Sequence, residues 1–326
     1  MTRTSKLAVA LIAFFLLTLG YASAQAVVFN NGWQDEGMRI GNGWYWNPEV
    51  VQLDDGTFRM YIEDHGLDGT VSNGTITLSS PQGIEWTYEG VAVMSNHPGV
   101  VRLPDGRWRL YFQQTDPTTG LSGIGSAVSS DGLTFETEEG LRLVSDAALE
   151  GADVRHPCVV ALDEGGYRMY YDTDQYGAFI RIWSASSADG LTFTREGLNI
   201  DLTPYRSDWP EGFYAHSSKP EVLKTTDGVW RMYFCSSPLT GSFYDPIGIR
   251  LATSTDGVNW TVKTGDPEIT GGIYPDGNQY STFDCSVLVV DDGSGQVLRM
   301  WYSLFMPPDF GLVGDYSAIY SAGKAL

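Results

Sequence analysis

The stretch His156-Pro157-Cys158-Val159-Val160 is followed by a glycine turn, by Tyr167-Arg168-Met169-Tyr170-Tyr171 and by the corner Ser187-Ala188-Asp189-Gly190. The same order of parts recurs along the chain, with an Arg-Met or Arg-Leu pair before an aromatic residue each time. The apolar runs that open the copies have proline at four heads and cysteine at the fifth: Pro48, Pro98, Pro157, Pro220 and Cys285. Copies at intervals of 50 to 65 residues indicate a repeat architecture.

Each copy contains four short runs rich in β-branched and aromatic residues, separated by Gly, Asp and Ser clusters, which predicts four antiparallel strands. Five such units predict an all-β fold, a five-bladed β-propeller with four strands per blade. The last unit stops after its third strand, at 316–323, whereas 33–40 is similar to the fourth strands of other units. We therefore expect strands built from 29–40 to complete blade five beside 316–322, so that no long sheet edge is left unpaired.

The N-terminus predicts export. A basic start at 1–6, an apolar run at 7–19 and Ala22-Ser23-Ala24 form a secretory signal peptide, 1–24, and leave a single propeller domain, 25–326. No other stretch approaches membrane length, so we expect a secreted or periplasmic monomer that does not associate with membranes. The formal net charge of −20 disfavours nucleic acid as a partner. Three cysteines within strand patterns predict buried thiols rather than a disulfide framework.

The two ends of the predicted propeller differ in their loops. Tight Asp-Gly turns, such as Asp55-Gly56 and Asp189-Gly190, occupy one end and are structural, because Gly supplies the positive φ that such turns need. Long aromatic-rich loops occupy the other end, where function is expected. Aromatic side chains there are candidate stacking surfaces for sugar rings, among them Trp44, Trp46 and Trp209.

The head of each inner strand lies beside the central axis, and side chains two residues apart point the same way. The residues before the prolines form a predicted upper ring: Asn47, His97, His156, Lys219 and Asp284. The residues after them form a predicted lower ring: Glu49, Gly99, Cys158, Glu221 and Ser286. Buried charges are costly unless they are paired or used, so these rings predict either an ion-pair network or a functional site.

The heads Trp46-Asn47-Pro48 and Arg155-His156-Pro157, with the blade pattern over 27–323, resemble the five-bladed glycoside hydrolases of families 43, 32, 62 and 68, and more distantly family 130. The resemblance implies three catalytic carboxylates at the heads of blades one, three and four. This chain has Asn47, His156 and Lys219 at those positions, so that catalytic set does not transfer.

Other carboxylates lie nearby, and glycoside hydrolysis needs two carboxyl groups about 5 to 10 Å apart. We expect Glu49 and Glu221 to form the pair across the axis, with Asp153 and Asp284 as further catalytic candidates. Lys219 or Arg155 would keep one carboxylate ionised while the other stays protonated. The sequence thus predicts a glycosidase that acts on a poly- or oligosaccharide in an axial pocket. Its expected substrate-binding residues are Trp44, Trp46, Asn47, His97, Arg155, His156, Trp209, His216 and Lys219.

Two alternatives stay open. The histidines all map to the long-loop end or the axis, and two or three of them with Asp153 or Asp284 would bind a metal ion in a metal enzyme. The other is a glycan-binding propeller without catalysis, whose expected mark is the loss of the family's carboxylates. The glycosidase needs no cofactor, although a structural or axial metal ion is compatible with it.

Overall fold

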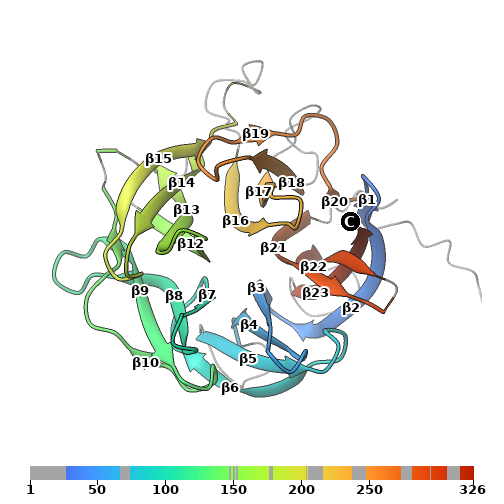
Figure 1. Cartoon of the computed structure of the whole chain (residues 1–326), viewed down its shortest axis with the longest axis horizontal. Coiled ribbons are helices and arrows are strands. Elements are labelled where there is room, and N and C mark those ends of the chain that lie inside the picture. Colours follow the sequence, from blue (N-terminus) through green and yellow to red (C-terminus); the bar gives the residue numbers. More distant parts are fainter. Residues whose placement is uncertain are drawn as a thin grey trace, which may run out of the picture.

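The computed structural model shows five antiparallel sheets arranged as blades around a central axis (Figure 1). It describes residues 27–66, 74–146, 148–149, 151, 153–175, 179–202, 204, 216–236, 247–272, 281–293, 295–306 and 316–326. The predicted five-bladed propeller is therefore confirmed. The predicted signal peptide and Trp209 lie outside the described residues. Within those residues, no helix has the length and apolar character needed to cross a membrane.

The blades follow one another in chain order, each with its first strand at the axis (Figure 1). Blade one is β3 (Tyr45–Gln52), β4 (Phe58–Asp64), β5 (Gly74–Ser80) and β6 (Thr87–Val93). Blade two is β7 (Gly99–Arg102), β8 (Trp108–Thr115) and β9 (Ser122–Ser129), with β10 (Glu136–Thr137) and β11 (Leu143–Val144) sharing the outer edge. Blade three is β12 (Asp153–Ala161), β13 (Tyr167–Gln175), β14 (Phe179–Ser187) and β15 (Thr194–Ile200).

Blades four and five hold the two ends of the described chain. Blade four is β16 (Ser217–Lys224), β17 (Trp230–Ser236) and β18 (Gly248–Ser254), with β19 (Thr261–Val262), β20 (Ile269–Gly271) and β1 (Val27–Phe29) outside them. Blade five is β21 (Ser281–Asp291), β22 (Gln296–Met306), β23 (Tyr316–Ala325) and β2 (Gln34–Gly43). The blue β2 therefore lies beside the red β23 in Figure 1, and the N-terminal strand closes the ring.

The expected closure is confirmed for β2, which pairs with β23 from Gln34 opposite Gly323 to Gly43 opposite Ser317. The expectation was wrong for Phe29, which pairs with Ile269 of blade four. The N-terminal segment thus adds β1 to blade four and β2 to blade five. Each added strand pairs with a sheet edge that would otherwise be exposed.

A cluster of polar side chains lies at this closure. Glu268 is buried and accepts a hydrogen bond from Trp33 Nε1 at 2.8 Å. It forms ion pairs with Lys263 at 2.7 Å and with Lys324 at 3.1 Å. We call Trp33, Lys263, Glu268 and Lys324 the closure cluster.

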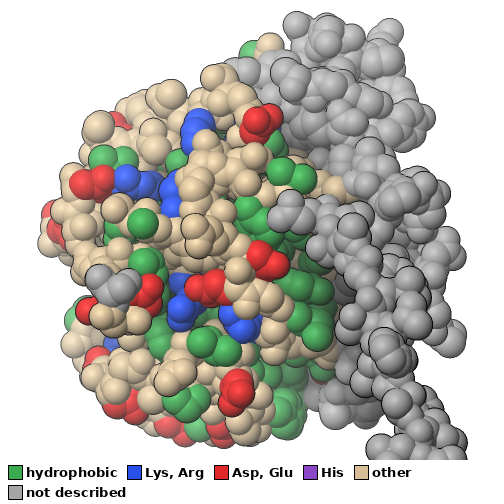
Figure 2. Space-filling model, turned by 90° about the vertical axis from the view of Figure 1, so that its right-hand side faces the viewer, with side chains coloured by type: hydrophobic (Ala, Val, Ile, Leu, Met, Phe, Trp, Pro, Cys, Tyr) green, Lys and Arg blue, Asp and Glu red, His purple; other side chains and the backbone are tan. Residues whose placement is uncertain are grey.

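On the side of the molecule seen in Figure 2, Lys and Arg side chains lie among Asp and Glu side chains rather than in a separate patch.

The repeated Arg-Met-Tyr strands connect neighbouring blades. In blade one, Arg59 and Tyr61 donate hydrogen bonds to the carbonyl oxygens of Asp131 and Gly132 in the Asp-Gly corner of blade two, at 2.5 and 2.8 Å. Equivalent contacts tie blade two to three, three to four and five to one. In blade five the chain does not turn from β23 into β2, because β2 comes from the N-terminus. The blade-four arginine, Arg231, therefore has no such corner to contact and binds Asp227 of its own blade.

Apolar clusters fill the space between adjacent blades. Met60 of blade one packs in the same cluster as Trp301 of blade five, and both are fully buried. Tyr61 joins blade one to a second cluster with Leu110 and Phe112 of blade two. The three cysteines are buried free thiols, as predicted. This packing holds the inner strands, and therefore the residues at their heads, in fixed positions.

Candidate functional site

The heads of the inner strands have an unusual backbone. Asn47, His97, His156 and Lys219 adopt positive φ angles of 51°, 60°, 49° and 56°. In blades one, three, four and five the strand pairing also shifts register at this point, as in a β-bulge. A left-handed conformation costs a non-Gly residue on the order of 1 kcal/mol and is concentrated at functional sites, and a bulge redirects a side chain.

Residues of both predicted rings line one axial cavity, among them Asn47, Glu49, His156, Lys219 and Glu221. The predicted convergence of these side chains on the axis is therefore confirmed. The cavity has a volume of about 30 Å³, far below the roughly 300 to 1,000 Å³ of small-molecule sites. A sugar ring does not fit between the two rings as they stand.

The lower ring ties each blade to the next. Its side chains accept hydrogen bonds from backbone amides of the neighbouring inner strand, and only Gly99 has no side chain to do so. A Cβ at Gly99 would lie 1.8 Å from the Pro157 carbonyl oxygen of blade three. The four bonds run from Val100 N to Glu49 Oε1 (3.2 Å), Val222 N to Cys158 Sγ (3.3 Å), Val287 N to Glu221 Oε1 (2.9 Å) and Val50 N to Ser286 Oγ (2.9 Å).

Burial makes the two lower-ring carboxyl groups weak acids. It raises the pKa of Glu49 well above 4.5, and the nearby Glu221 charge raises this pKa further. Burial also raises the pKa of Glu221 to about 7, against the hydrogen bonds from Val287 and Ser286. Both groups thus hold a proton under acidic conditions, which a general acid must do, but both are also engaged between blades beneath the upper ring.

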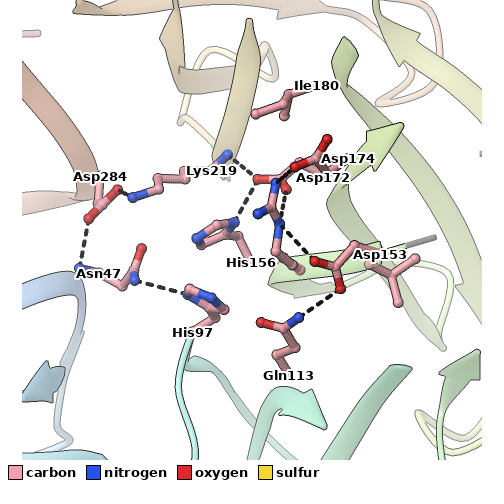
Figure 3. Close-up of polar contacts among 12 residues, drawn as sticks. Asn47, His97, Gln113, Asp153, His156, Asp172, Asp174, Ile180, Lys219 and Asp284 are labelled. Atoms are coloured by element: carbon pink, nitrogen blue, oxygen red, sulfur yellow. Dashed lines mark hydrogen bonds and ion pairs between the residues drawn. The ribbon is translucent and has the colours of Figure 1, made fainter. Parts of the chain in front are cut away.

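His156 of the upper ring pairs with Asp172, which comes from β13 of blade three (Figure 3). His156 Nδ1 lies 2.7 Å from Asp172 Oδ2, and the backbone N–H of Lys219 donates to the same oxygen at 2.8 Å. Burial lowers the pKa of His156 to about 4, although Asp172 opposes the shift. Burial acts to raise the pKa of Asp172, but His156 and Arg155 bring this pKa to about 2. At neutral pH the pair is therefore a neutral imidazole that donates Nδ1–H to a carboxylate.

This arrangement leaves one ring nitrogen of His156 available. In the described part of the chain, the buried Nε2 has no hydrogen-bond partner. It points away from Asp172 in Figure 3. The neighbouring His97 ring packs against the His156 ring, with 3.9 Å between centroids. Since the tautomer places the lone pair on Nε2, that atom is an acceptor at the axis.

Glu63 holds the side of the upper ring formed by blades one and two. It contacts His65 Nε2 at 2.7 Å and His97 Nδ1 at 3.2 Å, and it accepts a hydrogen bond from Asn47 Nδ2. Burial acts to raise the pKa of Glu63, but the two histidines hold this pKa far below its ordinary value. Glu63 is therefore a carboxylate.

Lys219 and Asp284 form an ion pair that closes the ring (Figure 3). Asp284 Oδ2 also accepts a hydrogen bond from Asn47 N at 2.9 Å. Burial acts to lower the pKa of Lys219, but Asp284 outweighs it and raises this pKa. The ammonium lies 5.5 Å from the ring centroids of Trp46 and Phe283. Lys219 thus places a permanent positive charge at the cavity.

The remaining predicted residues lie around this centre. Asp153 accepts a hydrogen bond from Gln113 at 2.9 Å and lies 3.9 Å from Arg155, which also contacts Asp172 at 3.4 Å. Burial lowers the pKa of His216, against Asp174 and Asp172. Trp44 packs edge-on against His65, and Trp46 stacks on Phe305. Among the described residues, no group of three or more His, Cys, Asp or Glu side chains is arranged to hold a metal ion.

Sequence reasoning missed Glu63 and Asp172. Both lie on second strands, two residues after the Tyr of the Arg-Met-Tyr pattern, and face the heads of the inner strands. The equivalent position is Gln113 in blade two. A carboxylate or amide two positions after the Tyr of the repeated pattern was the available signal.

Comparisons with known proteins agree with this architecture. No family profile and no curated protein matches the sequence. Solved structures do match. A thermostable family-43 glycoside hydrolase has a TM-score of 0.64 at 18% identity, over 87% of this chain and 90% of that one. The fold is that of the five-bladed propeller glycoside hydrolases.

Two further structures show the range of the fold. An N-acetylgalactosamine deacetylase from F. plautii, solved with blood group B trisaccharide, has a TM-score of 0.66 at 14% identity, over 92% of this chain and 96% of that one. The family-32 β-fructofuranosidase of Bombyx mori has a TM-score of 0.62 at 15% identity, over 88% of this chain and 61% of that one. At such identities the likeness concerns the fold.

Proposed function

We propose that this protein is an exported hydrolase that removes acyl groups from carbohydrate, with its site at the upper ring. The observation that carries the proposal is His156: Asp172 binds its Nδ1, and its Nε2 has no hydrogen-bond partner within the described residues. A buried nitrogen without a hydrogen-bond partner lowers the stability of the fold unless a ligand or a reacting water binds to it. Carbohydrate is the substrate class because propellers of this fold include glycoside hydrolases and a sugar deacetylase.

The protonation states favour an acyl bond over a glycosidic bond. Glycosidic cleavage needs a carboxylic acid that protonates the leaving oxygen. Beside the upper ring the pKa values of Glu63 and Asp172 are lowered, so neither holds a proton to give at neutral pH. A neutral imidazole beside an ammonium instead suits addition of water to an ester or amide carbonyl.

His156 and Lys219 supply the groups that hydrolysis of an acyl bond needs. His156 Nε2 takes a proton from water as the water oxygen bonds to the acyl carbon. The negative charge that develops on the carbonyl oxygen is stabilised by the Lys219 ammonium. Collapse breaks the bond to the sugar oxygen or nitrogen, which takes the proton back from His156. The products are a carboxylic acid and the free sugar hydroxyl or amine.

A glycosidase that uses Glu49 and Glu221 is the second candidate. Their raised pKa values favour it, because a general acid must be protonated at working pH. It requires the substrate to reach groups that now accept hydrogen bonds from Val100 and Val287 of the next blades.

One set of variants separates the candidates. His156→Asn suits the left-handed backbone at this position and can still donate to Asp172. The assay supplies O-acetylated and N-acetylated oligosaccharides and measures both released acetate and new reducing ends. We expect acetate release that falls by about 10²- to 10⁴-fold in His156→Asn, the range of a general base, and that persists in Glu221→Gln.

Other outcomes select the other functions. New reducing ends that disappear in Glu221→Gln would identify the glycosidase. Activity that is lost to a chelator and restored by added metal ion would identify a metal enzyme. Glycan binding with neither product would identify a binding propeller.

A further inference from the structure

A polar groove lies on blade two beside the upper ring. It has a volume of about 480 Å³ and is lined by Met94, Ser95, Asn96, Gln113, Gln114 and Thr115. Asn96 directly precedes His97 of the upper ring, and Gln113 binds Asp153 in Figure 3. The groove therefore adjoins the proposed reaction site.

Hydrogen bonds fix the walls of the groove. Gln113 N donates to the carbonyl oxygen of Asn96 at 3.1 Å, and Ser95 Oγ donates to the carbonyl oxygen of Gln113 at 2.5 Å. Thr75 of blade one holds the carbonyl oxygen of Ser95 at 2.7 Å. The groove thus lies between the segment Met94 to Asn96, which is anchored to blade one, and strand β8. These hydrogen bonds fix its shape.

Asn96 and Gln114 are two of the amide side chains that line the groove. Asn96 Oδ1 is buried and has no hydrogen-bond partner within the described residues. Gln114 lies over Gly125, where a Cβ would come within 2.1 Å of Gln114 Oε1. The absence of a side chain at Gly125 is therefore what leaves space for the Gln114 amide.

We propose that this groove binds a neutral sugar residue of the same glycan whose acyl group is processed at the upper ring, an inference that rests on the proposed function. Amides and hydroxyls are the groups that pair with sugar hydroxyls, and none of the six lining side chains carries a charge. Met94 is 70% exposed and offers an apolar surface to the C–H face of a sugar ring. The volume lies in the range of small-ligand sites, about 300 to 1,000 Å³.

The absence of charge also sets the selectivity. A uronic acid or sulfated sugar would lose its hydration in the groove without meeting a cation. The groove therefore accepts neutral oligosaccharides, and an acylated monosaccharide does not extend into it.

The test uses the full chain with a series of acetylated neutral oligosaccharides from one to six sugars. Asn96→Ala and Gln114→Ala should each raise KM for the longer members about fivefold to tenfold, as loss of a hydrogen bond does, with kcat unchanged and the monosaccharide unaffected. Gln82→Ala, at the exposed position of the Gln82-Gly83 corner of blade one, is the matched control and should change nothing. Gly125→Ala, which displaces Gln114, should reproduce the KM effect.

The outcomes distinguish this inference from the proposed function. Unchanged KM and unchanged glycan affinity in both alanine variants, with normal acetate release, would overturn the groove alone. Weaker oligosaccharide binding in the variants of a protein that releases no acetate would support the groove and overturn the hydrolase. A wild-type protein that binds no member of the series would overturn both.

Discussion

Replacing Glu221 by Gln tests whether this buried carboxyl group serves the fold or the chemistry. Glutamine keeps an oxygen that accepts the hydrogen bonds from Val287 N and Ser286 Oγ, and it removes the ionisable proton. If the lower ring ties blades together, Glu221→Gln leaves catalysis intact and changes how stability depends on pH.

The size of the effect follows from proton linkage. Glu221 has a folded-state pKa of about 7, raised by burial from 4.5. The unfolded chain therefore releases this proton at a lower pH than the folded chain does. The stability that the protonated group contributes is fully present below about pH 4.5 and is lost as pH rises to about 7, a total of about 3 kcal/mol. About 2.5 kcal/mol of this loss falls between about pH 5 and pH 8.5.

Denaturant unfolding at these two pH values measures the effect. Relative to wild type, Glu221→Gln should gain about 2.5 kcal/mol in unfolding free energy between about pH 5 and pH 8.5. Glu164→Gln, at an exposed turn, is the control and should gain nothing. Equal differences from wild type at both pH values would refute the reasoning, and so would a loss of glycan turnover without any change in stability.

Three further predictions concern the closure, a blade contact and the proposed base. Glu268→Ala leaves the partners of a buried carboxylate unpaired and should cost roughly 3 kcal/mol in denaturant unfolding, whereas a cost under about 1 kcal/mol would show that the closure cluster does not hold the ring. Gly83→Ala places a Cβ 2.7 Å from the Trp301 ring, and it should cost about 1 to 3 kcal/mol more than Gly228→Ala, which has a similar φ but open space. Equal costs for the two would exclude a steric role. The kcat/KM for acetate release should be constant at neutral pH and fall as pH drops through about 4, because His156 then gains a proton and can no longer act as a base; an acid limb near pH 7 would contradict this.

The repeats in the sequence determine the architecture of the ring. Pro48, Pro98, Pro157 and Pro220 mark the heads of inner strands, because a proline-headed apolar run followed by a Gly turn and an Arg-Met-Tyr strand describes one blade. The unfinished last unit likewise predicted closure by the N-terminus, since a three-stranded blade would leave an open edge. The spacing of the repeats is enough to predict the blades and their closure, because each blade is built from a local strand pattern and the blades must form a closed ring.

The sequence also identified which residues reach the axis, since alternation along a strand places residues before and after each proline on the same side. The sequence did not show which of these residues hold the blades together and which are available for catalysis. Glu49 and Glu221 look like a catalytic pair when only their proximity is known, but their hydrogen bonds run to backbone amides of the next blade. Those partners are 51 and 66 residues away in sequence and are set by how the blades pack.

Only the tertiary structure showed that Asp172 orients His156 and that Glu63 gathers His65 and His97. Both carboxylates come from second strands, so their contact with the heads of inner strands depends on strand register rather than on any motif. The protonation states depend on burial and on charges brought together from different blades. The sequence alone therefore determined a closed five-bladed ring with a polar axis, whereas folding decided which polar groups hold the ring together and which remain available for chemistry.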